Sequence, residues 1–273
     1  MIPAEFDYVA PESLDEALSA LQAEDAKVLA GGHSLIPLMK LRLAYPSLLV
    51  DLRRVPGLTG IERENGSWRI GAMTTHYAVV QAGLGLASTA AGLIADPQVR
   101  YRGTIGGTLA HGDPASDMPA VLLAAEGAVT VRGASGQREV AAADLFQDYM
   151  TTAVEDGEIL TEVRLPAMDG YGFGYEKFNR RKEDWAMVAV AAWVKKAADG
   201  SCEDVRIGLT HMASTPLRAT AAENALREGR SIAEAAALAA DGTEPPADLN
   251  ASAEYKRHLA TVLCRRALEQ ASQ

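Results

Sequence analysis

"AGGHSLIPLMKLR", residues 30–42, places two glycines, a histidine and a serine directly after the short apolar run Lys27–Ala30. The apolar run is typical of a buried strand, and Leu35–Leu41 is typical of a short helix. Glycine permits a tight turn and lets the backbone approach a bound group closely. The stretch therefore predicts a strand, a loop and a helix, in which the loop either only turns the chain or also holds the phosphates of a ligand.

A second stretch, "RGTIGGTLAHGDPASDMPAVLLA" at residues 102–124, has the same character: a glycine pair beside hydroxyl side chains, followed by an apolar helix from about Met118 to Ala125. The N–H groups of consecutive glycines can point at phosphate oxygens, and Ser34, Thr104 and Thr108 can add hydroxyl donors. Two such loops can converge on one diphosphate, and each can instead be an ordinary turn.

Neither stretch is a standard nucleotide motif. No GxxxxGK[ST] sequence occurs, so a Walker-type phosphate loop is excluded. The segment nearest to GxGxxG is Gly83–Ser88, which lacks the third glycine and lies in a helical pattern. A Rossmann dinucleotide site is therefore a poor interpretation.

Composition limits the function further. The 273 residues suffice for one or two domains, and the net charge of −10 argues against a nucleic-acid or anionic-membrane partner. The first residues, MIPAEFDYVAPE, are acidic where a secretory signal is basic, and the longest apolar run, Ala186–Val194, is too short to span a bilayer. We therefore expect a cytoplasmic protein with no integral membrane segment. Cys202 and Cys264 stand alone, so we expect no zinc or iron–sulfur site in this chain and interpret both as small buried hydrophobic residues.

Hydrophobic periodicity and turn residues predict the elements of the N-terminal part. They are a helix at Ser13–Leu21, strands at Lys27–Ala30, Leu48–Leu52 and Trp68–Ile70, helical segments from His76 to about Ala95 that end at Asp96-Pro97, a hairpin of Ala128–Arg132 with Gln137–Val140, and a strand at Glu158–Leu165.

The pattern changes at "PAMDGYGFGYEKF", residues 166–178, where strands come first and helices follow. The expected strands lie at about 171–178, 186–195 and 204–212, and the expected helices near 219–228, 231–240 and 252–271. This order predicts an α+β layer with helices on one side of a three-stranded antiparallel sheet. It also places a domain boundary near residues 166–170.

Three stretches together resemble a known family. "AGGHSLIPLMKLR", "TIGGTLAHGDPASDMPAVLLA" and "YEKFNRRKEDWAMV" are similar to signature stretches of the FAD-binding medium subunits of molybdenum hydroxylases. This family includes carbon monoxide dehydrogenase medium subunits, the flavin segment of xanthine dehydrogenase, and nicotine and caffeine dehydrogenase subunits. The resemblance runs from about residue 3 to about residue 270.

The resemblance implies a fold. Residues 1–167 would form a two-lobed FAD-binding domain of the vanillyl-alcohol-oxidase/MurB type, with lobes at about 1–55 and 56–167. Residues 168–273 would form a C-terminal α+β domain of the CO dehydrogenase flavoprotein type.

The resemblance also implies site residues. The FAD pyrophosphate would lie on two segments, Leu29, Ala30, Gly31, Gly32, His33, Ser34 and Leu35, and Thr104, Ile105, Gly106, Gly107 and Thr108. Asp117 would contact the adenosine side, Leu160 and Lys177 would lie against the ring system or the ribityl chain, and Trp185 would lie close to the isoalloxazine. A shift of one residue would put Glu176 in place of Lys177.

Other roles remain open for these side chains. His33 and His111 can brace the loop backbone instead of moving protons, and Asp117 can cap the helix that follows it. Trp185 can be core packing, and the basic run from Lys177 to Lys182 can be a solvated or partner-facing surface. His76, His211 and His258 show no usable arrangement.

The functional expectation follows from the resemblance and from the absence of a metal set or a nucleophile–base pair. FAD would carry the redox chemistry. The chain would take electrons from two [2Fe–2S] clusters of an iron–sulfur small subunit, which receives them from a molybdopterin-binding large subunit, and would pass them to an external acceptor. A dimer of heterotrimers is the expected assembly. Two alternatives stay open, a self-sufficient MurB-like flavin oxidoreductase and a flavin-free binding module.

Overall fold

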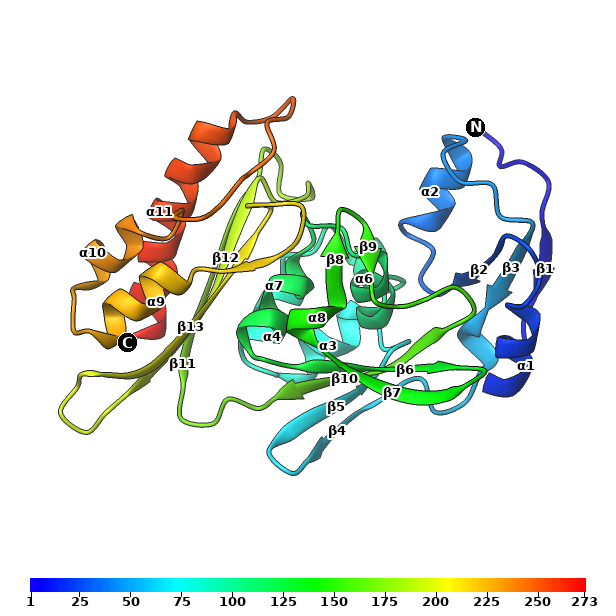
Figure 1. Ribbon diagram of the computed structural model, residues 1–273. Coiled ribbons are helices and arrows are strands. Elements are labelled where there is room, and N and C mark those ends of the chain that lie inside the picture. Colours follow the sequence, from blue (N-terminus) through cyan, green and yellow to red (C-terminus); the bar gives the residue numbers. More distant parts are fainter.

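The computed structural model describes Met1–Gln273, which form four sheets with helices packed between and beside them (Figure 1). The strands are β1 (Asp7–Val9), β2 (Ala26–Leu29), β3 (Leu48–Asp51), β4 (Ile61–Glu64), β5 (Ser67–Gly71), β6 (Ala128–Gly133), β7 (Gly136–Ala141), β8 (Phe146–Asp148), β9 (Thr151–Thr152), β10 (Ile159–Pro166), β11 (Gly172–Phe178), β12 (Val188–Lys196), β13 (Cys202–Thr210) and β14 (Leu217–Arg218). The helices are α1 (Leu14–Ala20), α2 (Leu35–Lys40), the 3-10 helix η1 (Leu52–Arg54), α3 (His76–Ala82), α4 (Leu86–Gly92), α5 (Pro97–Arg100), α6 (Ile105–His111), α7 (Asp117–Ala124), α8 (Ala142–Leu145), α9 (Thr220–Arg227), α10 (Ile232–Ala237) and α11 (Ala253–Ala271).

The N-terminal lobe, on the right of Figure 1, is a three-stranded parallel sheet in the order β1-β3-β2. Helix α2 lies on the crossover from β2 to β3, so the predicted strand, loop and helix are confirmed. The predicted first helix is also confirmed, and the Ser13 hydroxyl accepts a hydrogen bond from the Glu16 N–H at 3.2 Å. Strand β1 was not predicted, because it has three residues and no buried face.

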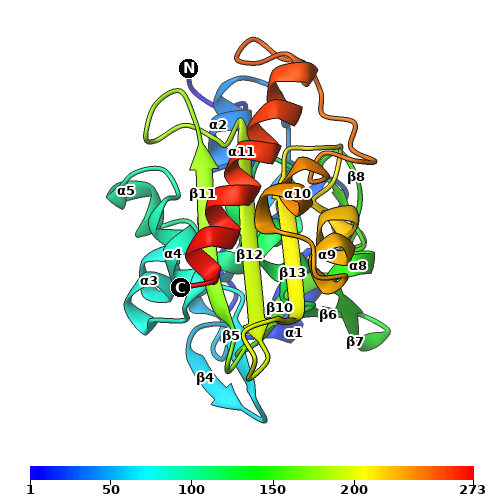
Figure 2. The same cartoon turned by 90° about the vertical axis from the view of Figure 1, so that its left-hand side faces the viewer.

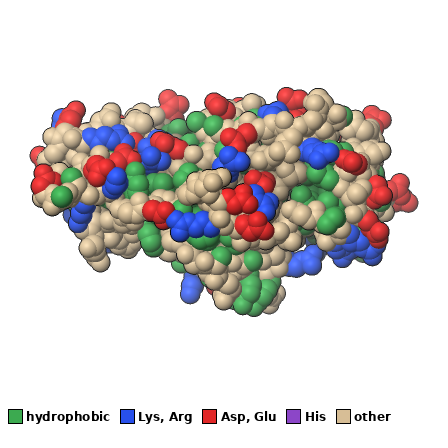
Figure 3. Space-filling view, turned by 90° about the horizontal axis from the view of Figure 1, so that it is seen from below, with side chains coloured by type: hydrophobic (Ala, Val, Ile, Leu, Met, Phe, Trp, Pro, Cys, Tyr) green, Lys and Arg blue, Asp and Glu red, His purple; other side chains and the backbone are tan.

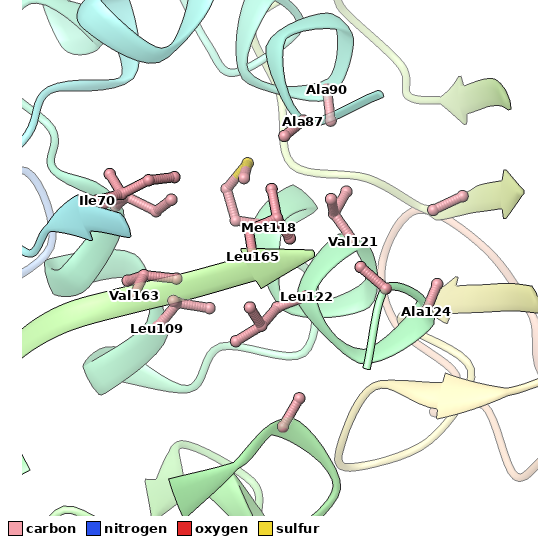
Figure 4. Packing of buried hydrophobic residues seen from close by; sticks show 14 of the residues in the cluster. Ile70, Ala87, Ala90, Leu109, Met118, Val121, Leu122, Ala124, Val163 and Leu165 are labelled. Atoms are coloured by element: carbon pink, nitrogen blue, oxygen red, sulfur yellow. The ribbon is translucent and has the colours of Figure 1, made fainter. Parts of the chain in front are cut away.

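The central sheet has five antiparallel strands in the order β4-β5-β10-β6-β7. The predicted hairpin is confirmed as β6 and β7. Helices α4, α6 and α7 share one core with this sheet, and Figure 4 shows Met118 and Val121 of α7 between Leu165 of β10 and Ala87 of α4.

The expected helical segments from His76 to about Ala95 are α3 and α4, and Gly83 ends α3 with a left-handed conformation (φ 68°). The expectation for Asp96-Pro97 is wrong, because this pair begins a helix after α4 has already ended at Gly92. The Asp96 carboxylate accepts the Val99 N–H at 2.9 Å, and proline fits the first turn of α5 because it has no N–H to satisfy.

The C-terminal sheet is antiparallel in the order β11-β12-β13-β14, and α9, α10 and α11 cover one of its faces (Figure 2). Alternate residues of β12 enter different cores: Ala189, Ala191 and Trp193 pack toward the central unit, whereas Val190 and Val194 pack under the helices. Burial of both faces explains the unbroken apolar run of this strand. The α+β prediction is confirmed, but the sheet has four strands, because the two-residue β14 shows no sequence pattern.

The surface carries charges of both signs. Seen from below, acidic and basic side chains are interspersed with hydrophobic ones (Figure 3). No helix has the length and apolar character needed to cross a bilayer. Cys264 is buried as expected, whereas Cys202 is only half-buried.

Candidate functional site

A cavity of about 550 Å³ lies where segments of all three large sheets meet. Its lining includes Ala30–Leu35 from the N-terminal lobe, Ile159 and Leu160 of β10, and Glu183–Trp185 from the connection between β11 and β12. The predicted site residues that line it are Ala30, Gly31, Gly32, His33, Ser34, Leu35, Thr104, Gly106, Gly107, Thr108, Asp117, Leu160, Lys177 and Trp185.

Leu29 and Ile105 are not among the residues that line the cavity. Leu29 is the last residue of β2 and is half-buried, and Ile105 is 1% exposed within the core of the central unit. The Leu29 side chain packs near Gly32, where an added methyl group would lie 3.3 Å from the Leu29 Cδ1.

The two glycine clusters touch each other, as the sequence suggested. A methyl group built on Gly31 would lie 2.3 Å from the Arg102 carbonyl oxygen and 2.8 Å from the Gly103 Cα. A methyl group on Gly107 would lie 3.5 Å from the Ala30 Cβ. Only glycine at position 31 lets the backbones of the two clusters approach this closely.

The first cluster leaves its amides free. The N–H groups of residues 30–35 donate no hydrogen bond within the chain, and Ser34, which precedes α2, makes no side-chain capping bond. Gly32 has a φ of 78°, a left-handed conformation that turns the chain between β2 and α2. A run of free amides at a cavity can bind an anion without help from lysine or arginine.

The second cluster is not the loop we expected from the sequence. Its glycines lie in the first turn of α6, and the Thr104 hydroxyl caps this helix by accepting the Gly107 N–H at 3.2 Å. The Thr108 N–H donates to the Thr104 carbonyl at 3.1 Å as the helix continues.

The remaining amides of this cluster bind the segment before α3. The Ile105 N–H donates to the Thr74 carbonyl at 3.0 Å, and the Gly106 N–H donates to the Ala72 carbonyl at 2.9 Å. A methyl group on Gly106 would lie 2.5 Å from the Ala72 Cβ, so this glycine allows close packing. The second cluster can therefore offer a ligand the hydroxyls of Thr104 and Thr108, but not a row of amides.

A buried ion pair forms another part of the wall. The Lys177 ammonium lies 2.9 Å from an Asp117 carboxylate oxygen, and the side chains of Lys177 and Asp117 are 4% and 3% exposed. The Tyr175 hydroxyl donates to the other oxygen of Asp117 at 2.5 Å, and Lys177 also donates to the Leu93 carbonyl at 3.1 Å.

Burial raises the pKa of Asp117 above the ordinary value of a carboxyl group, although Lys177 and Tyr175 oppose that shift. Burial and the nearby Asp117 raise the pKa of Tyr175 well above its ordinary value. Asp117 lies inside the first turn of α7, with Ser116 as N-cap residue, so it does not cap the helix. Glu176 binds Gln270 on α11 instead, so Lys177 is the residue of the two that lines the cavity.

Trp185 lies at the end of the loop between β11 and β12 and is 55% exposed, which excludes a core-packing role. Asn179 closes this loop by donating to the carbonyls of Lys182 and Asp184 at 3.2 and 3.3 Å. Arg180, Arg181 and Lys182 are exposed, as expected for a solvated or partner-facing run, but the expectation is wrong for Lys177, whose side chain is buried in the ion pair with Asp117.

His76 is the main site residue that sequence reasoning missed. It is 2% exposed, lines the cavity, and places Nε2 3.1 Å from the Thr108 hydroxyl oxygen. A lone histidine at a helix start gives no sequence signal, because its partner lies 32 residues away along the chain. His33 and His111 also line the cavity, and His33 is exposed.

Comparisons with known proteins agree with the geometry. Residues 4–168 match the family model of the FAD binding domain in molybdopterin dehydrogenase, and residues 173–271 match the CO dehydrogenase flavoprotein C-terminal domain. The carbon monoxide dehydrogenase medium chain of Afipia carboxidovorans is 45% identical over 283 residues, which cover 99% of this chain and 98% of that protein.

Two solved structures have nearly the same fold. A chain of carbon monoxide dehydrogenase from Hydrogenophaga pseudoflava superimposes with a TM-score of 0.95 at 44% identity, covering 99% of this chain and 98% of that one. A chain of quinoline 2-oxidoreductase from Pseudomonas putida 86 gives a TM-score of 0.94 at 33% identity, covering 100% and 99%. The chain therefore belongs to the family of FAD-binding medium subunits of the molybdenum hydroxylases.

Proposed function

We propose that this chain binds FAD in the cavity and is the electron-transfer subunit of a cytoplasmic molybdenum hydroxylase. In this role it accepts electrons from the [2Fe–2S] clusters of a partner subunit and delivers them to an external acceptor. The observation that carries the proposal is the row of free amides at residues 30–34, set along a cavity in a chain of this family.

The residues present fit a dinucleotide. The amides of residues 30–34 would hold the diphosphate, and the hydroxyls of Thr104 and Thr108 would add donors from the adjoining second cluster. Because Asp117 and Lys177 form one ion pair, they would lie against the same part of the ligand, and Leu160 and Trp185 would lie along the ribityl chain and the rings. A volume of about 550 Å³ is within the range of small-molecule and cofactor sites.

Bound FAD supplies the electron transfer that no side chain of this protein provides. The chain itself binds the diphosphate and holds the ammonium group of Lys177 beside the buried carboxylate of Asp117.

We also propose the partners. The structure has no group of three or more His, Cys, Asp or Glu side chains that could hold a metal ion. The metal centres would therefore lie on a molybdopterin-binding large subunit and an iron–sulfur small subunit, in a dimer of heterotrimers. We further propose that residues 1–167, with lobes at about 1–55 and 56–167, and residues 168–273 are separate domains.

Purification of the chain alone and with co-expressed partner subunits tests this function. We expect a yellow chain with one FAD, which an organic substrate reduces only in the assembled complex. Reduction of the isolated chain by such a substrate would favour a self-sufficient flavoenzyme. A colourless chain that takes up no FAD would contradict the proposal.

A further inference from the structure

His76 connects the wall of the cavity to the second glycine cluster. It is the first residue of α3, and its backbone N–H donates to the Gly103 carbonyl at 2.9 Å. The imidazole packs against Gly103, where an added methyl group would lie 3.0 Å from the His76 Cδ2. Its Nε2 lies 3.1 Å from the Thr108 hydroxyl oxygen, and Thr108 itself lines the cavity.

The imidazole of His76 is neutral near pH 7. Burial, as the largest cause, together with the nearby Arg100 and His33 lowers its pKa to about 4. Arg100 is fixed in place, because its guanidinium donates to the carbonyls of Ile94 and Ala95 at 2.6 and 2.9 Å. A neutral imidazole has one N–H donor and one acceptor nitrogen, so two tautomers remain.

The surroundings of Nδ1 select between these tautomers. Nδ1 is buried and has no hydrogen-bond partner in the chain. A proton on Nδ1 would leave a buried N–H unpaired, which is rarer and less favourable than an unpaired acceptor. The proton therefore belongs on Nε2, where it donates to the Thr108 oxygen. Thr108 then keeps its own hydroxyl proton for another acceptor, and no group of the chain accepts it.

We propose that His76 is a positioning residue that makes the Thr108 hydroxyl a hydrogen-bond donor toward an anionic oxygen of the ligand in the cavity. The inference rests on the proposed function, in which that oxygen belongs to the diphosphate of FAD. A hydroxyl that accepts one hydrogen bond donates a stronger second one, because the two bonds polarise each other.

A double-mutant cycle tests whether His76 acts through Thr108. The apo chain is titrated with FAD, with flavin fluorescence as the readout, for the wild type, His76→Leu, Thr108→Val and the double variant. We expect each single variant to weaken FAD binding about tenfold, the effect of one hydrogen bond to a charged group. The double variant should bind no more weakly than Thr108→Val, because His76 then has no hydroxyl to orient.

Two further variants separate this role from packing. His76→Gln should retain most of the affinity, because its amide nitrogen can reach the place of Nε2 and donate to Thr108. His258→Leu, an exposed histidine on α11, should leave FAD binding unchanged. Additive losses in the cycle, or a His76→Gln variant as weak as His76→Leu, would overturn the inference.

The tautomer can be read without any ligand. A ¹⁵N NMR spectrum of the apo wild-type chain near pH 7, assigned by the signals that His76→Gln removes, should show the proton on Nε2. A proton on Nδ1 would overturn the inference even if a leucine variant fails to fold. Failure of the wild-type chain to bind FAD would instead overturn the proposed function and the ligand role with it. Normal FAD binding with an additive cycle would overturn the role of His76 alone.

Discussion

Residues 30–34 and 104–108 both combine a glycine pair with hydroxyl residues, yet their main-chain amides differ in whether they are hydrogen-bonded within the chain. The first segment leaves its N–H groups without an acceptor in the chain. The second uses its amides to start α6 and to bind the segment before α3. The two segments are in contact, so this difference arises within one wall of the cavity.

The comparison shows that each glycine of a pair has its own task. Gly31 and Gly106 each face the backbone of another segment at a distance that excludes a side chain. All four glycines line the cavity, but only Gly32 has a left-handed backbone, and a methyl group on Gly107 would lie 2.7 Å from the Thr104 hydroxyl oxygen. A glycine pair in a sequence therefore does not by itself predict free amides.

The largest expected effect is loss of stability when the contact between the two clusters is broken. In Gly31→Ala the new methyl group would lie 2.3 Å from the Arg102 carbonyl oxygen, so the two backbones must separate. We expect the free energy of unfolding to fall by about 3 kcal/mol. Urea unfolding measures this free energy.

Gly92→Ala is the matched control, because Gly92 lies in a helix and its new methyl group would meet only Val80 at 3.9 Å. Equal stability of the two variants would contradict the close contact.

The next effect is the dependence of stability on pH that arises from His76, which packs against the second cluster. The pKa of His76 falls from 6.5 to about 4 on folding, so the unfolded chain binds this proton more readily. Stability from this group is complete above pH 6.5 and is lost as pH falls toward 4. The wild type should therefore lose about 3 kcal/mol more than His76→Gln between pH 7 and pH 4. Urea unfolding at a series of pH values checks this, and parallel curves for the two proteins would show that His76 is not buried and neutral.

A smaller loss of stability is expected when the left-handed turn of the first cluster is strained by a substitution at Gly32. Gly32→Ala places a side-chain residue at a φ of 78°, which should cost about 1 to 2 kcal/mol of stability. FAD affinity should fall at least tenfold, because relief of the strain turns the neighbouring amides away from the cavity. Thermal unfolding and FAD titration measure the two effects. Unchanged FAD affinity in a folded Gly32→Ala protein would contradict a role for this turn.

The smallest effect compares the two hydroxyl residues. The Thr104 hydroxyl caps α6, so Thr104→Val should lower stability by about 1 kcal/mol. Ser34 makes no capping bond, so Ser34→Ala should change stability by less than about 0.5 kcal/mol. Its effect should instead be a severalfold loss of FAD affinity. A reversed pattern would mean that the serine, not the threonine, holds the backbone.

Local hydrophobic patterns were sufficient to predict the α+β layer. Contact between the two clusters was only one of two open alternatives, because a contact between distant segments has no local sequence signal. The sequence could not reveal helix α6. Adjacent glycines disfavour a helix, and this helix depends on the Thr104 cap and on packing against Ala72, more than thirty residues earlier. His76 was missed for a related reason, since its burial and its bond to Thr108 exist only after folding. Strands β1 and β14 are too short to carry a period-2 pattern.

The central claim is that the amides of residues 30–34, and not those of residues 105–108, bind the FAD diphosphate. Hydrogen exchange of individual amides, followed by NMR in the apo and FAD-loaded chain, tests it most directly. We predict fast exchange at residues 30–34 in the apo chain and at least tenfold slower exchange with FAD, whereas residues 105–108 should exchange slowly in both states. Unchanged exchange at residues 30–34 on saturation with FAD would contradict the account.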